Sequence, residues 1–168
     1  KKNHINIDPL LPIFGTVQIQ YERPVYKNVS FSLSVGWKTS SGIFKVKGFN
    51  TNRISTDDFN FKGIKIIPEF RWYVQNPDVL LSGFYIGNYF KYQNYKDKIE
   101  GVYIDRNQGT NDFRIDAKMI TYAVGLQIGY KLMIMKRFFI DFIIAGPGVS
   151  FNTFKLEEKE AIPDAFYD

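Results

Sequence analysis

The chain has 168 residues, of which 45% are apolar and 23% are charged, as expected for one folded domain spanning residues 1–168. It has no cysteine and a single histidine, His4, which excludes disulfide frameworks, zinc fingers and thiol nucleophiles and leaves little for a histidine-based metal site or catalytic triad. The net charge of +5 comes from dispersed residues rather than a basic stripe, so we expect no nucleic-acid partner.

Alternation of apolar and polar residues dominates the chain and predicts β-strands, because successive side chains of a strand point to opposite faces. Residues 2–8 carry a short alternation, and residues 14–23 and 29–38 carry longer ones that we expect to pair as a hairpin. The contrast is strongest in 29–38, where Val, Phe, Leu, Val and Trp share one face and Ser, Ser, Ser, Gly and Lys share the other.

The same pattern continues to residue 151, and no segment has a convincing helical period. The further predicted strands are 62–74, 81–93, 117–132 and 137–151. Short turns are expected near 24–28, 75–80 and 133–136, and long polar loops at 39–61, 94–116 and 152–168.

Two architectures fit such strands: a soluble barrel turns its apolar face inward, and an outer-membrane barrel turns it outward into lipid. Three features favour the membrane. The polar face combines charged and very small residues, as a narrow lumen requires; short turns alternate with long loops; and aromatic residues lie near strand ends, as in interfacial girdles. The expected girdle residues are Tyr21, Trp37, Trp72, Tyr73, Tyr92, Tyr130 and Phe138.

Chain length sets the size of the barrel, because eight strands of about ten residues leave room for loops and sixteen would leave none. We therefore predict an all-β fold, a small antiparallel up-and-down transmembrane β-barrel of about eight strands, seven of them readable. Its lumen should be closed to solutes and filled by side chains such as Tyr85 and Tyr89. The residues expected to face lipid are Phe31, Leu33, Val35, Tyr122, Val124, Leu126, Ile128, Ile140 and Phe142, and those expected to face the lumen are Ser32, Ser34, Gly125, Gln127 and Asp141.

Five segments carry a resemblance to a known family. They are YERPV (21–25), KIIPEFRWYV (65–74), GFYIGNYFKYQNY (83–95), AVGLQIGYKL (123–132) and RFFIDFIIAGPGVSF (137–151). They resemble small outer-membrane barrels of Bacteroidota-type bacteria that are described only as a domain of unknown function. The resemblance implies an eight-stranded, OmpA/OmpX-like architecture in the outer membrane and carries over no catalytic residues. The family ends on a final strand, whereas residues 152–168 do not read as one.

The candidate site consists of charged residues expected to face the lumen: Glu22, Lys65, Glu69, Arg71, Lys91 and Asp141. Such residues could form a proton path or a polar ligand site. Because buried charges must be paired wherever they occur, we interpret them as a structural network inside the barrel. We assign no catalytic residue, metal ligand or cofactor. Gly125 and Gly129 share one strand face and are interpreted as space for bulky neighbours.

The leading hypothesis is a non-enzymatic barrel of the bacterial outer membrane, a structural or accessory subunit of an outer-membrane assembly, with outer-membrane lipid and other outer-membrane proteins as partners. The alternatives are a soluble or periplasmic β-barrel that binds an apolar ligand inside, and a lipid-modifying enzyme of the outer membrane that would use His4. Because open sheet edges are costly in hydrocarbon, we expect either a returning eighth strand beyond Asp168 or a partner that covers the edge between the first and seventh strands.

Overall fold

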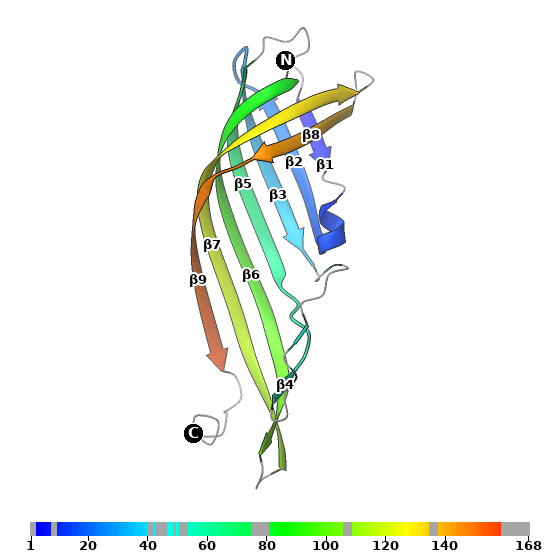
Figure 1. Ribbon diagram of the computed structural model, residues 1–168, viewed down its shortest axis with the longest axis vertical. Helices are drawn as coiled ribbons and strands as arrows, with labels where there is room; N and C mark the ends of the chain where they lie inside the picture. Colours follow the sequence, from blue (N-terminus) through cyan, green and yellow to red (C-terminus); the bar gives the residue numbers. More distant parts are fainter. Residues whose placement is uncertain are drawn as a thin grey trace.

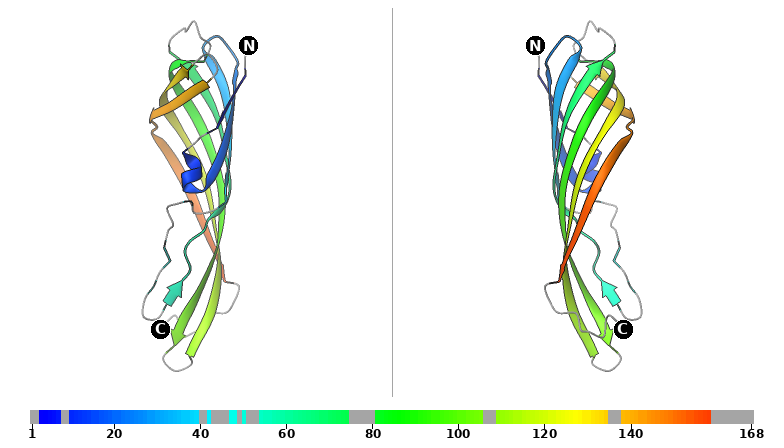
Figure 2. Two further views of the ribbon diagram at one scale, coloured as in Figure 1. Left: turned by 90° about the vertical axis from the view of Figure 1, so that its right-hand side faces the viewer. Right: turned by 90° about the vertical axis from the view of Figure 1, so that its left-hand side faces the viewer.

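The computed structural model of the chain is an antiparallel β-sheet that curls about its long axis (Figures 1 and 2). The structure describes residues 3–7, 10–39, 42, 47–48, 50, 54–74, 81–105, 109–134 and 138–158. The predicted turn at 75–80, residues 135–136 of the predicted 133–136 connection and the tail from 159 onward lie outside these residues.

Each strand of the main path pairs with its neighbour along the chain, in the order β1-β2-β3-β5-β6-β7-β8, while β4 pairs with β6 and β9 with β7. The strands are β1 (His4–Ile7), β2 (Thr16–Pro24), β3 (Val29–Lys38), β4 (Ile54–Thr56), β5 (Lys62–Tyr73), β6 (Gly83–Asp105), β7 (Gly109–Ile134), β8 (Phe138–Ala145) and β9 (Gly148–Glu158). A short 3₁₀ helix, η1 (Leu11–Phe14), joins β1 to β2. No helix in the described residues is long and apolar enough to cross a membrane.

β8 and β9 together occupy the last strand position of the sheet. β8 pairs with the C-terminal part of β7, and β9 pairs with its N-terminal part. The Leu126 N–H donates to the Pro147 carbonyl at 2.9 Å, so the ladder continues between the two pieces. A register shift opposite Ile128 and Gly129 marks a β-bulge, which bends the strand. Seven strand positions result, which confirms the seven strands predicted from the alternation.

The two edges of the sheet are β1 and the β8–β9 strand, and within the described residues they do not pair with each other. The sheet is therefore a curled half-barrel with an open seam. At one end the edges approach, because the ring of His4 stacks on that of Phe139 with centroids 4.3 Å apart. A cavity of about 380 Å³ opens along the seam, lined by Gln18 and Gln20 on one side and Phe142 on the other.

The two faces of the sheet divide as the alternation predicts. On the convex face Val124 and Leu126 are 52% and 54% exposed, whereas on the concave face Ser32 and Gln127 are 0% and 7% exposed. Large apolar side chains therefore cover the outside of the curl, and polar side chains are buried inside it. The expectation that Leu33 and Val124 would not pack in the interior is met, because Leu33 alternates with buried serines and is half-buried on the outer face.

The predicted long loops are wrong in three places. Most of the 94–116 segment forms strand, because β6 and β7 stay paired up to Asp105 and Gly109. Residues 152–158 belong to β9, and the 39–61 segment contains β4. In residues 94–105 polar residues occur on both faces of the strand, so the sequence loses its alternation while the backbone ladder continues. At the start of β7 the alternation persists with the opposite phase, because Phe113 and Ala117 are buried on the inner face and charged residues lie on the outer one. The long β6–β7 hairpin extends beyond the other strands (Figure 1).

One residue assigned to the aromatic girdle is wrongly placed. Tyr73 is 1% exposed and faces the interior, where its hydroxyl donates to Glu22 Oε1 at 2.8 Å. Its position two residues after Arg71 puts both side chains on the same face of β5, and this alternation overrides its location at a strand end. Trp37 and Trp72 do lie on the outer face, 44% and 57% exposed, while the side chain of Phe138 lies outside the described part.

Candidate functional site

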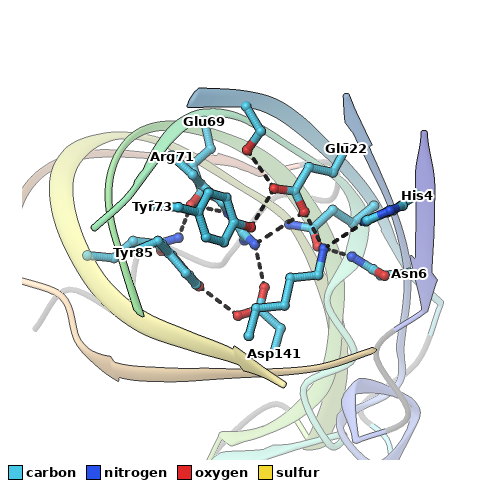
Figure 3. Close-up of polar contacts among 12 residues, drawn as sticks. His4, Asn6, Glu22, Glu69, Arg71, Tyr73, Tyr85 and Asp141 are labelled. Carbon is cyan, nitrogen blue, oxygen red and sulfur yellow. Dashed lines mark hydrogen bonds and ion pairs between the residues drawn. The ribbon is translucent and has the colours of Figure 1, made fainter. Parts of the chain in front are cut away.

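Five charged side chains meet inside the curl at the end where the edges approach (Figure 3). We call Glu22, Glu69, Arg71, Lys131 and Asp141 the lumenal cluster. They come from four strands, β2, β5, β7 and β8, which form different walls of the half-barrel. Glu22, Arg71 and Lys131 are at most 1% exposed. The cluster therefore ties together strands that are not neighbours in the sheet.

The register explains why these large side chains fit inside. Glu22 of β2 lies directly opposite Ser32 of β3, which in turn lies opposite Glu69 of β5. Arg71 lies opposite Ser30 on one side and Gly87 on the other. Glu22 and Glu69 thus each face a small residue on one side, and Arg71 does so on both sides, so the small residues of the polar face provide the space that the sequence pattern predicts.

Gly125 and Gly129 have the same function on β7. A Cβ atom at Gly125 would lie 2.7 Å from the ring of Tyr89, and one at Gly129 would overlap the ring of Tyr85. Distances this short require the neighbour to move. The interpretation of these glycines as space for bulky lumenal neighbours is confirmed.

Arg71 is the centre of one half of the cluster. Its guanidinium binds Glu69 through Nε at 2.7 Å and Asp141 Oδ2 through Nη1 at 2.5 Å, and it lies over the ring of Tyr85 at 4.5 Å. The Tyr85 hydroxyl donates to the second oxygen of Asp141 at 2.7 Å, and Gln127 donates to Glu69. The planar fork of arginine suits this arrangement, because it presents several donors to two carboxylates at once.

Glu22 is the centre of the other half. Lys131 Nζ and Ser30 Oγ both donate to its carboxylate at 2.5 Å, and Arg71 Nη1 lies 3.7 Å away. Lys131 also lies 4.7 Å from the centre of the Phe139 ring and 3.5 Å from Nδ1 of His4. The two halves therefore share Arg71, and His4 on the edge strand contacts the cluster through Lys131.

The cluster holds three carboxylates, one guanidinium and one lysine amine, joined by ion pairs and charge-assisted hydrogen bonds. Such a network resists rearrangement, because a buried charge that loses its partner is left without solvation. The described residues contain no group of His, Asp and Glu side chains arranged to hold a metal ion. The arrangement can fix the relative positions of four strands, and its donors are already satisfied by acceptors of the protein.

The structure brings together four of the six predicted site residues: Glu22, Glu69, Arg71 and Asp141. It does not place Lys65 or Lys91 in the cluster. Gly36 of β3 lies directly opposite Lys65, and a Cβ there would lie 2.9 Å from Lys65 Cε, so this side chain extends across the inner face toward β3.

Sequence reasoning missed three residues of the site, Lys131, Tyr73 and Gln127. Each lies on the polar face of its strand, so alternation gave the signal for their orientation. Their partners could not be inferred, because Glu22 and Lys131 are 109 positions apart and meet only through the curl of the sheet.

Comparisons with known proteins add one finding. No curated protein and no solved structure matches the chain. A family model matches residues 5–160, which is most of the chain. The chain therefore belongs to the family described as Protein of unknown function (DUF3575).

Proposed function

We propose that this protein is a non-enzymatic β-barrel of the bacterial outer membrane that acts as a structural or accessory subunit of an outer-membrane assembly. The observation that carries the proposal is the inverted polarity of the sheet, with apolar side chains outside and charged pairs inside. Ile128, Ile140 and Phe142 are 44%, 42% and 50% exposed on the convex face, while Glu22 and Arg71 are buried within the concave one. Lipid is the solvent that favours this arrangement.

A soluble barrel that binds an apolar ligand would require the opposite arrangement. Its interior would be lined by apolar side chains, and its outside would carry polar ones. Here the interior holds a cluster of five charges, and the exterior exposes a contiguous band of large apolar residues over several strands. Soluble monomers rarely expose apolar patches above a few hundred Å².

The open seam supports the accessory-subunit part of the proposal. In hydrocarbon each unpaired amide or carbonyl group costs several kcal/mol, so the free edges of β1 and β8 need hydrogen-bonding partners. A further antiparallel strand between these edges would satisfy both. We propose that such a strand completes the barrel in the membrane and that the seam is where this protein meets the rest of its assembly.

The two tryptophans of the chain allow a direct test. Trp37 and Trp72 lie on the outer face near opposite ends of β3 and β5. Variants W37F and W72F leave one tryptophan each. After reconstitution into phosphatidylcholine vesicles, bromines near the lipid glycerol should quench the fluorescence of both variants strongly, and bromines at mid-chain should quench it less.

The result that would overturn the proposal is a protein that folds in buffer without detergent or lipid and shows no quenching by either brominated lipid. Aqueous iodide serves as the control, because it should quench both tryptophans in the unfolded chain and neither in the membrane-inserted one. Quenching of only one tryptophan would place the membrane band at one end of the sheet and would contradict a transmembrane orientation.

A further inference from the structure

Four lysines form a continuous row across the outer face of the sheet. Lys62 of β5 lies directly opposite Lys96 of β6, Lys96 lies opposite Lys118 of β7, and Lys118 lies opposite Lys155 of β9. Three of the side chains are exposed and that of Lys118 is half-buried. The four strands lie side by side (Figure 1). We call these residues the lysine row.

Like charges in directly opposite positions destabilise a sheet. In the described part of the chain, none of the four ammonium groups forms an ion pair with a carboxylate. Neighbouring positions closer to the hairpin tip are different, since Lys98 lies opposite Asp116, and Glu100 lies opposite Arg114 with an Nε–Oε1 distance of 3.8 Å. Asp116 also lies opposite Glu157, so this adjacent row holds two carboxylates and one ammonium group, whereas the lysine row holds ammonium groups alone.

Carboxylates do lie near the row without pairing with it. A hollow on β6, β7 and β9 is lined by four lysines and three carboxylate residues: Lys96, Lys98, Lys118, Lys155, Asp97, Asp116 and Glu157. Asp116 lies 3.7 Å from Arg114, so part of its charge is already engaged. The hollow thus presents several ammonium groups around a space that is open to the outside.

The row has a defined position relative to the aromatic residues of the outer face. The rings of Tyr92 and Tyr122 lie 5.3 Å apart, and Phe151 lies opposite Tyr122. On β6, β7 and β9 the lysine is four residues from this aromatic row, and on β5 it is four residues from Ile66 at the same level. Four residues span about 13 Å along the strand and about 10 Å along the barrel axis at the usual tilt. If the aromatic row marks the edge of the hydrocarbon, the lysines lie at the level of lipid headgroups.

We propose that the lysine row binds the phosphate groups of anionic membrane lipids around the long-hairpin end of the barrel. This inference rests on the proposed membrane location. Lysine ammonium groups bind phosphate as point charges, and four strands spaced about 4.8 Å apart spread them over about 14 Å. That length matches a headgroup with two phosphates or two adjacent phospholipids. The bound phosphates supply the negative charge that the protein does not.

The test uses the full chain in non-ionic detergent micelles with fluorescent phosphatidic acid as the probe. Wild-type protein should bind this probe more tightly than fluorescent phosphatidylcholine. K96Q/K118Q, which removes the centre of the row, should weaken binding roughly 25-fold, or about fivefold for each lysine. K96R/K118R should retain binding, because it keeps the charge. R23Q/K27Q removes the same charge from exposed residues near the opposite end and should bind like wild type.

Several outcomes would overturn the inference: equal binding of the two probes by wild type, wild-type affinity in K96Q/K118Q, or an equal loss in R23Q/K27Q. Displacement of phosphatidic acid by an equimolar amount of inorganic phosphate would indicate a site for free phosphate and would also overturn it. Tryptophan quenching in vesicles, measured on the same variants, separates the two proposals. If wild type and K96Q/K118Q are both quenched but show no lipid preference, the membrane location stands and the lysine row does not bind lipid phosphate.

Discussion

The pair formed by Glu22 and Lys131 shows what a single contact contributes across the lumen. Both side chains are fully buried, and their 2.5 Å contact joins β2 to β7 on another wall of the sheet. Removing both partners of such a pair can be nearly neutral, whereas removing one leaves a buried charge without a partner. The contact therefore favours the curvature of the sheet that brings β2 and β7 together over any curvature that separates Glu22 from Lys131.

Lys131→Met is expected to lower the free energy of unfolding by about 3–5 kcal/mol, because it leaves Glu22 buried with only part of its positive surroundings. Urea titration of the protein in lipid vesicles, followed by circular dichroism, measures this change. Lys91→Met is the matched control, since Lys91 is half-buried and lies outside the cluster, and it should cost less than about 1 kcal/mol. E22L/K131M should be more stable than K131M alone. Equal losses in K131M and K91M would contradict this role.

For single residues the sequence predicts well which face a side chain lies on, and it predicts poorly which residues that side chain contacts. The inward direction of Glu22, Glu69, Arg71 and Asp141 follows from their place in alternating strands. The identity of their partners depends on which strands face each other across the lumen. A local sequence pattern carries no information about this arrangement. Lys65 illustrates the limit, because it shares a face with Glu69 and Arg71 but extends toward Gly36 on the neighbouring strand β3.

Adjacent strands fit together through alternation of large and small residues. Tyr85 of β6 lies directly opposite Gly129 of β7, and its ring occupies the space that a side chain at Gly129 would need. Gly146, in the step between β8 and β9, differs because a Cβ there would meet its nearest atom at 3.4 Å, an ordinary contact. Two glycines close in space thus carry different constraints.

Gly129→Ala is expected to destabilise the folded protein by about 1–3 kcal/mol, because the added methyl group overpacks against the buried ring of Tyr85. Gly146→Ala should change stability by less than about 0.5 kcal/mol. Both are measured by thermal unfolding in the same detergent. A G129A protein as stable as G146A would contradict this expectation, because it would show that β6 and β7 accommodate the added methyl group without loss of stability.

The sequence identified the strands whose apolar face turns outward. It missed β4, the far ends of β6 and β7, and residues 152–158 of β9. β4 has only three residues, charged residues occupy both faces of the far end of β6 and of residues 152–158, and at the start of β7 the alternation has the opposite phase. Hydrophobic alternation reports burial of one face rather than strand pairing itself, so a ladder surrounded by water on both sides leaves a weak signal. Tyr73 lies near a strand end, which suggests an aromatic girdle, but it shares the inner face of β5 with Arg71 and is therefore buried.

The whole molecule is a narrow curl whose interior is filled at one end. Arg71, Tyr85 and Lys131 are each at most 1% exposed, and they come from three different strands. The cavity of about 380 Å³ beside Arg71 and Asp141 opens along the seam, where the strand that we propose to complete the barrel would lie. An eight-stranded barrel has an interior just wide enough for side chains.

Reconstituted wild-type protein is therefore expected to show no stable conductance in planar bilayers. The double variant R71A/Y85A, which removes two of the largest buried side chains, should conduct more than wild type if it folds, and circular dichroism checks that it does. A steady single-channel current from the wild type would contradict a filled lumen, because it requires a continuous path wider than a hydrated ion.

The order of the strands also bears on how the chain assembles. Along the main path each strand pairs with its predecessor, and the longest ladder, between β6 and β7, closes over a connection of a few residues between Asp105 and Gly109. Hairpins of this kind form early, because little chain entropy is lost in closing them. The contact between Glu22 and Lys131 spans 109 positions and cannot form until the intervening hairpins have joined. We therefore expect the ion pairs of the interior to form last. They then stabilise only those sheets whose strands have already paired in the right order.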